Sequence, residues 1–165
     1  MAVALQNILR FIFLILLQVF ILDNIQFMGY INPMIYVLFI LSLPVRFPKW
    51  ALLILAFIMG LIIDVFSNTA GMHSFALVFA AFLRTPVINI FTSLDEGANP
   101  TPSFHTFGVS AYVKYVVILV LIHHFILFFI ESFSFLHLTL LIPKIIFSST
   151  VTILLILGLQ SFKSK

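Results

Sequence analysis

Two short stretches of the chain place ionisable side chains inside otherwise apolar sequence, and the first runs from Gly60 to Phe75. Gly60 and Asp64 are four residues apart, so they project from one face of a helix. Gly60 lets another helix approach closely. Asp64 is suited to cap a helix, to accept hydrogen bonds from the following turn or to meet a partner, and Gly71 and His73 begin the next apolar segment. A turn capped by Asp64 is the favoured interpretation, and with that role an asparagine at position 64 should retain much function.

The second stretch contains His123-His124 and, seven residues further on, Glu131. Adjacent residues point about 100° apart on a helix, so the two imidazoles cannot chelate one metal ion from one face. We expect each histidine to bond a neighbouring helix, with metal binding and a proton relay as less favoured alternatives. His137 and Lys144 follow in the last apolar segment, where Lys144 either extends toward the membrane surface or pairs with Glu131.

Signatures of catalysis are missing from this sequence. It contains no G-x-S-x-G, H-E-x-x-H, Walker A or G-x-G-x-x-G pattern. The five acidic residues are scattered, and without cysteine there is no thiol nucleophile or thiolate metal ligand. We therefore expect a protein that is not an enzyme, with no cofactor, no metal site and no catalytic residues.

The composition indicates the solvent of this chain. Of its 165 residues 63% are hydrophobic and 8% are charged, and the mean hydropathy is +1.28. Soluble domains carry about 25% charged residues. The apolar runs are continuous rather than alternating, which excludes an outer-membrane barrel. The sequence predicts a single integral membrane domain over residues 1–165, built as an all-α, polytopic bundle of transmembrane helices.

About 20 apolar residues are needed to cross a bilayer. Polar breaks with Asn, Pro, Gly and Asp divide the chain into six candidate spans: 5–22, 27–43, 50–65, 72–83, 113–130 and 136–159. Residues 85–112 are expected to form a long loop. Val87–Phe91 within it either lies in the membrane interface or finishes the fourth helix.

The positive charges predict the orientation of these spans. With both termini in the cytoplasm, the inner side holds seven basic residues: Arg10, Arg46, Lys49, Arg84, Lys114, Lys163 and Lys165. The outer side holds Asp23, Asp64 and Glu131, with Lys144 as its one basic residue. This asymmetry follows the positive-inside rule, so residues 85–112 are expected in the cytoplasm.

The stretch Gly60–Phe75 resembles the G-L-x-x-D-x-x…x-G-x-H motif of the MreD family, the small rod shape-determining membrane proteins. The chain length, the six predicted spans and the short N-terminus also match this family, and His123–Phe135 resembles the corresponding part of MreD proteins from Bacteroidetes-type bacteria. The resemblance implies a scaffold of the cell-elongation machinery in the inner membrane. It also implies a direct partner, MreC, and indirect links to MreB filaments and the peptidoglycan synthases.

A scaffold of this kind meets its partners through helix faces, and small residues allow close packing in lipid. Gly60, Gly71, Ala76 and Ala80 are the best candidates for such contacts, either with a partner or within the monomer. In architecture the family resembles the substrate-binding S-components of energy-coupling transporters. The main alternative is therefore a membrane subunit that binds a small molecule for transport, and an enzyme of lipid or wall metabolism is weaker still.

Overall fold

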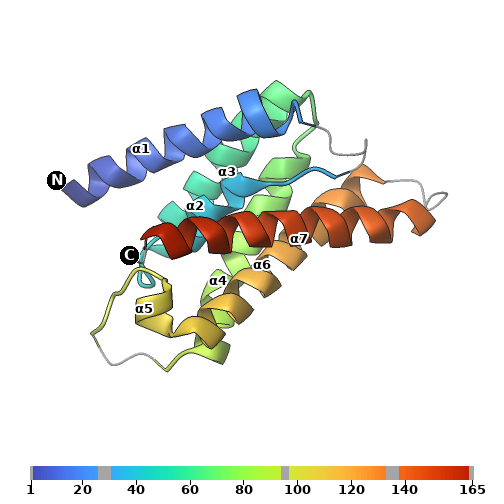
Figure 1. The fold of residues 1–165 in the computed structure, drawn as a ribbon. Helices are drawn as coiled ribbons and strands as arrows, with labels where there is room; N and C mark the ends of the chain where they lie inside the picture. Colours follow the sequence, from blue (N-terminus) through green and yellow to red (C-terminus); the bar gives the residue numbers. More distant parts are fainter. Residues whose placement is uncertain (1, 26–30, 94–96, 133–137, 164–165) are drawn as a thin grey trace.

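The computed structural model describes residues 2–25, 31–93, 97–132 and 138–163. The described residues form an all-α bundle with five helices that are long and apolar enough to cross a membrane: Leu5–Leu22, Lys49–Ser67, Met72–Phe91, Val109–Glu131 and Leu141–Phe162. The all-α class is confirmed, whereas the expected count of six helical spans is corrected to five in the part of the chain that the structure describes. The start of α1 (Ala2–Leu17) and the end of α7 (Leu138–Lys163) lie at the same end of the bundle (Figure 1).

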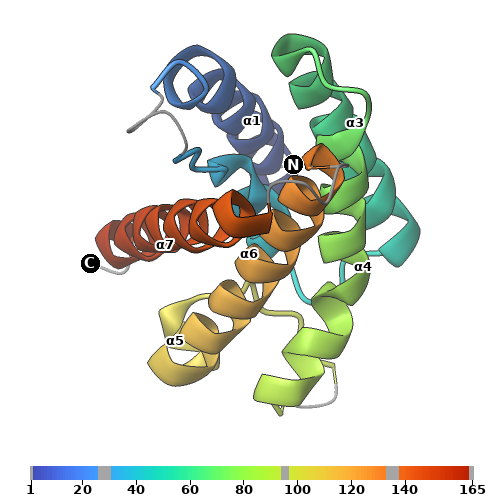
Figure 2. The same cartoon turned by 90° about the vertical axis from the view of Figure 1, so that its right-hand side faces the viewer.

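The long helices form a continuous layer. The helix α3 (Lys49–Ser67) packs on α4 (Met72–Phe91), α4 packs on α6 (Val109–Glu131), and α6 packs on α7. The helix α1 packs on α3. It continues directly into a π-helical turn, η1 (Gln18–Leu22). Figure 2 shows the same helices from a direction at 90° to that of Figure 1.

The second predicted span, 27–43, is wrong as a helix in its described part. Residues 31–34 are not helical, and only a short 3-10 turn, η2 (Ile35–Val37), and one turn of α-helix, α2 (Leu38–Leu41), follow. The segment nevertheless runs antiparallel to α1, because Pro33 contacts Gln18 and Ser42 contacts Arg10 eight residues earlier on α1. Residues 26–30 lie outside the described part of the chain.

Side chains from distant helices replace the missing helical hydrogen bonds of this segment. The backbone N–H of Asn32 donates to Ser148 Oγ at 3.0 Å, and that of Met34 donates to Thr152 Oγ1 at 3.0 Å. The N–H of Ile35 donates to Gln18 Oε1 at 2.9 Å, while Gln18 Nε2 donates to the carbonyl of Pro33. Irregular backbone is tolerated at membrane depth only when protein satisfies it in this way. A hydropathy pattern cannot reveal partners more than 100 residues away.

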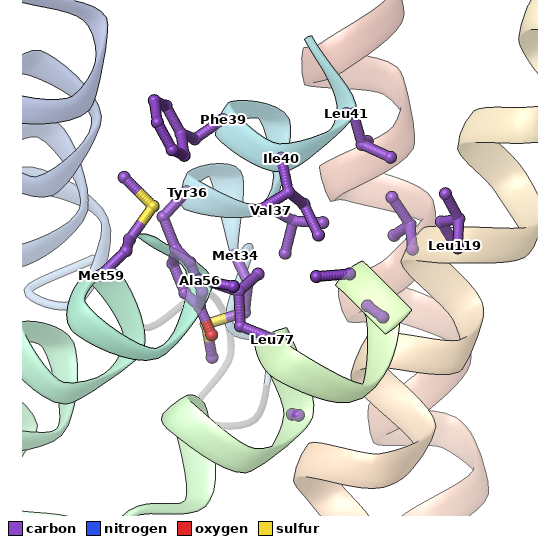
Figure 3. Packing of buried hydrophobic residues seen from close by; sticks show 14 of the residues in the cluster. Met34, Tyr36, Val37, Phe39, Ile40, Leu41, Ala56, Met59, Leu77 and Leu119 are labelled. Carbon is purple, nitrogen blue, oxygen red and sulfur yellow. The ribbon is translucent and has the colours of Figure 1, made fainter. Parts of the chain in front are cut away.

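This irregular segment fills the centre of the bundle. Tyr36, Val37, Ile40 and Leu41 are fully buried. Figure 3 shows them packed among Ala56 and Met59 of α3, Leu77 of α4 and Leu119 of α6. The outer surfaces of the long helices are correspondingly apolar, as lipid-facing helices require.

The predicted loop over residues 85–112 is also corrected. The helix α4 continues past Pro86 to Phe91, so Val87–Phe91 finishes the fourth helix. Val87 and Ile88 are buried, and this packing outweighs the hydrogen bond lost at the proline. A short helix, α5 (Phe104–Phe107), follows, and α6 starts at Val109, four residues before the predicted span.

The two ends of the bundle differ in charge. We call the end with the 44–48 turn and residues 97–107 the basic end, and Val45 N donates there to the carbonyl of Pro100 at 3.0 Å. We call the opposite end the acidic end, because Asp23, Asp64 and Glu131 lie there.

Candidate functional site

Asp64 caps the first turn of α4 from the end of α3. It is 2% exposed. Its Oδ1 accepts from Thr69 Oγ1 at 2.6 Å and from His73 N at 3.0 Å, and its Oδ2 accepts from Ser74 N at 2.9 Å and from Ser74 Oγ at 2.6 Å. Of the roles that the sequence left open, the carboxylate therefore performs both the helix cap and the bonds to the turn. Four donors saturate a single carboxylate.

The other residues of the Gly60–Phe75 stretch support this turn. Gly60 lies one helical turn before Asp64, directly against the backbone of His73 and Ser74. Gly71 precedes α4 with φ +81°, a left-handed conformation that favours glycine. The stretch thus joins α3 to α4 by backbone contact at one turn and by a carboxylate at the next.

A chain of three buried rings extends from this turn into the core. His73 Nδ1 and Tyr36 Oη are 2.8 Å apart, and the same oxygen lies 3.0 Å from His123 Nε2. The Tyr36 hydroxyl can donate to only one imidazole at a time and accepts from the other. Among the described residues His123 Nδ1 has no hydrogen-bond partner. Tyr36 could not be singled out from the sequence, because nothing in its apolar segment marks it as a neighbour of two histidines.

His124 faces a different neighbour, as the angle between adjacent helical residues requires. Its Nδ1 contacts the carbonyl of Val120 at 2.9 Å, and its Nε2 lies 3.2 Å from Thr152 Oγ1 on α7. In the part of the chain that the structure describes, no three His, Cys, Asp or Glu side chains come together as a metal site. The two histidines therefore join α6 to separate elements, namely η2 and α7.

Glu131 and Lys144 form an ion pair between α6 and α7 at the acidic end. Lys144 Nζ lies 2.8 Å from Oε1 and 2.7 Å from Oε2 of Glu131. The same ammonium group lies 4.6 Å from the centre of the Phe128 ring. Both side chains are partly exposed, so the pair contributes little to stability on its own. His137 lies outside the described residues.

The small residues of α4 face the interior. Ala76 and Ala80 are fully buried in the described structure, where α4 lies between α3 and α6. They therefore bring helices of the monomer together, as Gly60 does. Candidate contacts with other proteins must lie on other faces.

A polar cavity of about 360 Å³ opens at the acidic end. His73 and Asn32 lie in its wall beside the carboxylates of Asp23 and Glu131; the other lining residues are Val19, Asn24, Met34, Phe66, Ser67, Thr69, Met72, Leu127 and Phe128. Asp23 accepts from Gln18 Nε2 at 2.7 Å and from Ser67 Oγ at 3.3 Å, so neutral donors hold its carboxylate. The sequence predicted Asp23 on the outer side. It gave no signal that the amide of Gln18, five residues earlier, donates to the Asp23 carboxylate.

Arg84 is expected from the sequence among the basic residues of the cytoplasmic side, just after the fourth predicted span. It is instead fully buried within α4. Its Nη2 donates to the carbonyls of Leu43 and Pro44, its Nε donates to Tyr115 Oη at 3.1 Å, and Tyr115 in turn donates to the carbonyl of Leu41 at 3.0 Å. Arg84 thus fixes the end of the irregular segment against α4 and α6. Its Nη1 has no partner among the described residues.

Comparisons with protein-family models, with curated proteins and with solved structures gave no match for this chain.

Proposed function

We propose that this protein is a non-catalytic scaffold of the cell-elongation machinery in the inner (cytoplasmic) membrane. The observation that carries the proposal is the use of the polar groups in the MreD-like stretch. Asp64 accepts four hydrogen bonds, all of them from the turn and from α4. The Nδ1 atom of His73 shares a hydrogen bond with the Tyr36 hydroxyl. Groups committed to internal contacts hold a shape and leave little for chemistry on a substrate.

The partner in this proposal is MreC, which connects the scaffold to MreB and to the peptidoglycan synthases. The apolar face of α1 supports contact with a partner helix, because α1 is the least covered of the long helices. Its exposed large side chains are Leu5, Ile8, Leu9, Ile12, Phe13 and Leu16. Close packing on such a face drives helix association in lipid.

The orientation in this proposal places the basic end in the cytoplasm. Arg46, Lys49 and Lys114 are exposed in the described structure, and all three lie at or near this end. Positive charge retained on the cytoplasmic side is the strongest sequence determinant of orientation.

Depletion of the protein tests the scaffold. Cells kept in rich medium should widen and round up, because the wall enzymes remain while their insertion loses its spatial organisation. The full chain, extracted in mild detergent, should retain MreC through purification. Rods that persist after depletion, or a complex without MreC, would contradict the proposal.

One observation favours a second candidate, a small-molecule-binding subunit of an energy-coupling type transporter. The cavity at the acidic end brings His73, two carboxylates and two asparagines together around about 360 Å³. Ligand sites are concave and carry a few convergent polar groups. This candidate predicts that depleted cells need one added small molecule, that their shape recovers with growth, and that an ATP-binding-cassette module co-purifies.

A further inference from the structure

A second cavity, of about 470 Å³, lies at the basic end, and neither candidate function uses it. Its walls are the turn before α3 and the last two turns of α4. The lining residues are Val45, Arg46, Phe47, Pro48, Lys49, Thr85, Asn89 and Thr92. Two cationic side chains, two hydroxyls and one amide therefore surround the space, and none of the described residues that line it is acidic.

The positive charges of this cavity have no carboxylate partner in the described structure. The one ion pair among the described residues is Glu131–Lys144, at the opposite end of the bundle. The backbone of Arg46 is fixed instead, because Arg46 N donates to Asn99 Oδ1 at 2.7 Å. The turn that presents Arg46 and Lys49 is thus held in place while their side chains remain exposed.

Arg84 adds a third positive charge behind the cavity. Arg84 precedes the lining residue Thr85, and its guanidinium donates to the carbonyl of Pro44, the residue before Val45. All of its described partners are neutral oxygens, so its charge is not cancelled. A charge in a low-dielectric interior acts over a longer distance than a charge in water.

The surroundings of the cavity are those of a membrane surface. Trp50, next to Lys49, is 70% exposed, as tryptophans at the headgroup level commonly are. On α4, Phe82 lies three residues before Thr85 and seven residues before Asn89. It therefore continues the helix face of these two residues toward the bilayer centre. Phe82 is 65% exposed. A bound molecule would therefore meet cations and hydroxyls at one end and apolar side chains at the other.

We propose that this cavity binds the phosphate of an anionic phospholipid, with phosphatidylglycerol as the simplest case. Arg46 and Lys49 pair with the phosphate, Thr85 and Asn89 bond the headgroup oxygens, and the acyl chains lie along Phe82 and Trp50. Basic pockets between transmembrane helices are suited to anionic headgroups. Free phosphate has the same charge chemistry, but it would leave the apolar part of the site uncovered.

Trp50 is the only tryptophan of the chain, so it reports on this site directly. The full chain is reconstituted in phosphatidylcholine vesicles that contain increasing fractions of dibromo-phosphatidylglycerol, and quenching of Trp50 fluorescence gives the preference over dibromo-phosphatidylcholine. We expect a clear preference for phosphatidylglycerol. Arg46→Gln and Lys49→Gln should each lower it about fivefold, because each removes one of the two charges that contact the phosphate directly.

Lys114→Gln is the matched control, because it removes one exposed charge near the same end outside the cavity. It should change the preference less than about twofold. Equal quenching by both lipids, or equal losses in all three variants, would overturn the proposal. So would displacement of the lipid by millimolar inorganic phosphate at constant ionic strength, since the ligand would then be free phosphate.

The chain's own carboxylates are the remaining competitor. Asp95 and Glu96 follow α4 and lie outside the described residues. If the wild type has no preference and the Asp95→Asn/Glu96→Gln variant acquires one, the occupant is this acidic segment and the lipid proposal is wrong. A wild-type preference that the variant keeps supports the proposal.

Discussion

A Cβ atom placed on Gly60 would lie 2.4 Å from the Cα of Ser74 and 2.6 Å from its backbone nitrogen. Backbone, unlike a flexible side chain, cannot move aside without shifting the whole helix. Gly60 therefore sets the distance between α3 and α4, and one turn later Asp64 sets their register by bonding Ser74 twice.

Gly60→Ala should separate these helices and lower the stability of the folded protein by about 1–3 kcal/mol, the usual cost of overpacking. The melting temperature of the detergent-solubilised chain measures this effect. Gly158→Ala on α7 is the matched control, because a Cβ there meets nothing within 4 Å. A Gly60→Ala variant that melts with Gly158→Ala would contradict the close approach.

Asp64→Asn should be less tolerated than the sequence suggested. An amide offers one acceptor oxygen where the carboxylate offers two, so about half of its four accepted bonds are lost and the new NH2 group faces a backbone N–H. We expect a loss of about 1–2 kcal/mol for asparagine and more for leucine. Folded yield after gel filtration should fall in that order. Glu131→Gln, which alters an exposed ion pair, should stay close to wild type.

Arg84→Met should cost about 3 kcal/mol or more, because the buried carbonyls of Leu43 and Pro44 and the Tyr115 hydroxyl lose their donor. Arg84→Lys should fall between wild type and methionine, since one ammonium group cannot reproduce the planar fork. Thermal melting and folded yield measure both variants. Wild-type stability of Arg84→Met would refute the interior position of this residue.

Tyr36→Phe should remove both contacts of the buried ring chain and destabilise the protein by about 1–3 kcal/mol. A double-mutant cycle with His123→Leu should give a coupling energy of about 0.5 kcal/mol or more, because the two residues share a hydrogen bond. The same cycle with Lys114→Gln should be additive. Additivity in both cycles would exclude the Tyr36–His123 bond.

A cysteine at Asn99 should react with a membrane-impermeant maleimide only after the inner membrane is opened, because we place the basic end in the cytoplasm. A cysteine at Ala70, in the turn at the other end, should react in intact cells once any outer membrane is permeable. Both positions are exposed, and the natural chain has no cysteine. The reverse pattern of labelling would invert the orientation.

The helical bundle and four of its long helices could be predicted closely, since continuous apolar runs carry that information locally. The irregular segment over residues 31–41 could not, because its backbone is satisfied by Gln18, Ser148 and Thr152, which hydropathy treats as minor interruptions. Pro86 misled the prediction for the opposite reason. It is a helix breaker by local preference, and the packing of Val87 and Ile88 overrides that preference.

The candidate site was predictable only where its residues are close in sequence. Gly60, Asp64 and His73 lie within 14 residues of one another, and their spacing was enough to suggest a cap. Tyr36, His123 and Arg84 meet partners between 31 and 87 residues away, so only the folded chain brings them together. Their polarity could be read from the sequence, but their partners could not.

The hydrogen bonds from residues 32 and 34 to α7 have a consequence for biosynthesis. The hydroxyls of Ser148 and Thr152 leave the ribosome more than 100 residues after the backbone groups that they accept from. The irregular segment over residues 31–41 therefore cannot reach its final conformation while the chain is being made in order from the N-terminus. Until α7 is made, the backbone N–H groups of Asn32 and Met34 must bond to water or to another protein. Truncation within α7 should consequently damage the first third of the protein, even though every residue of that third has been made.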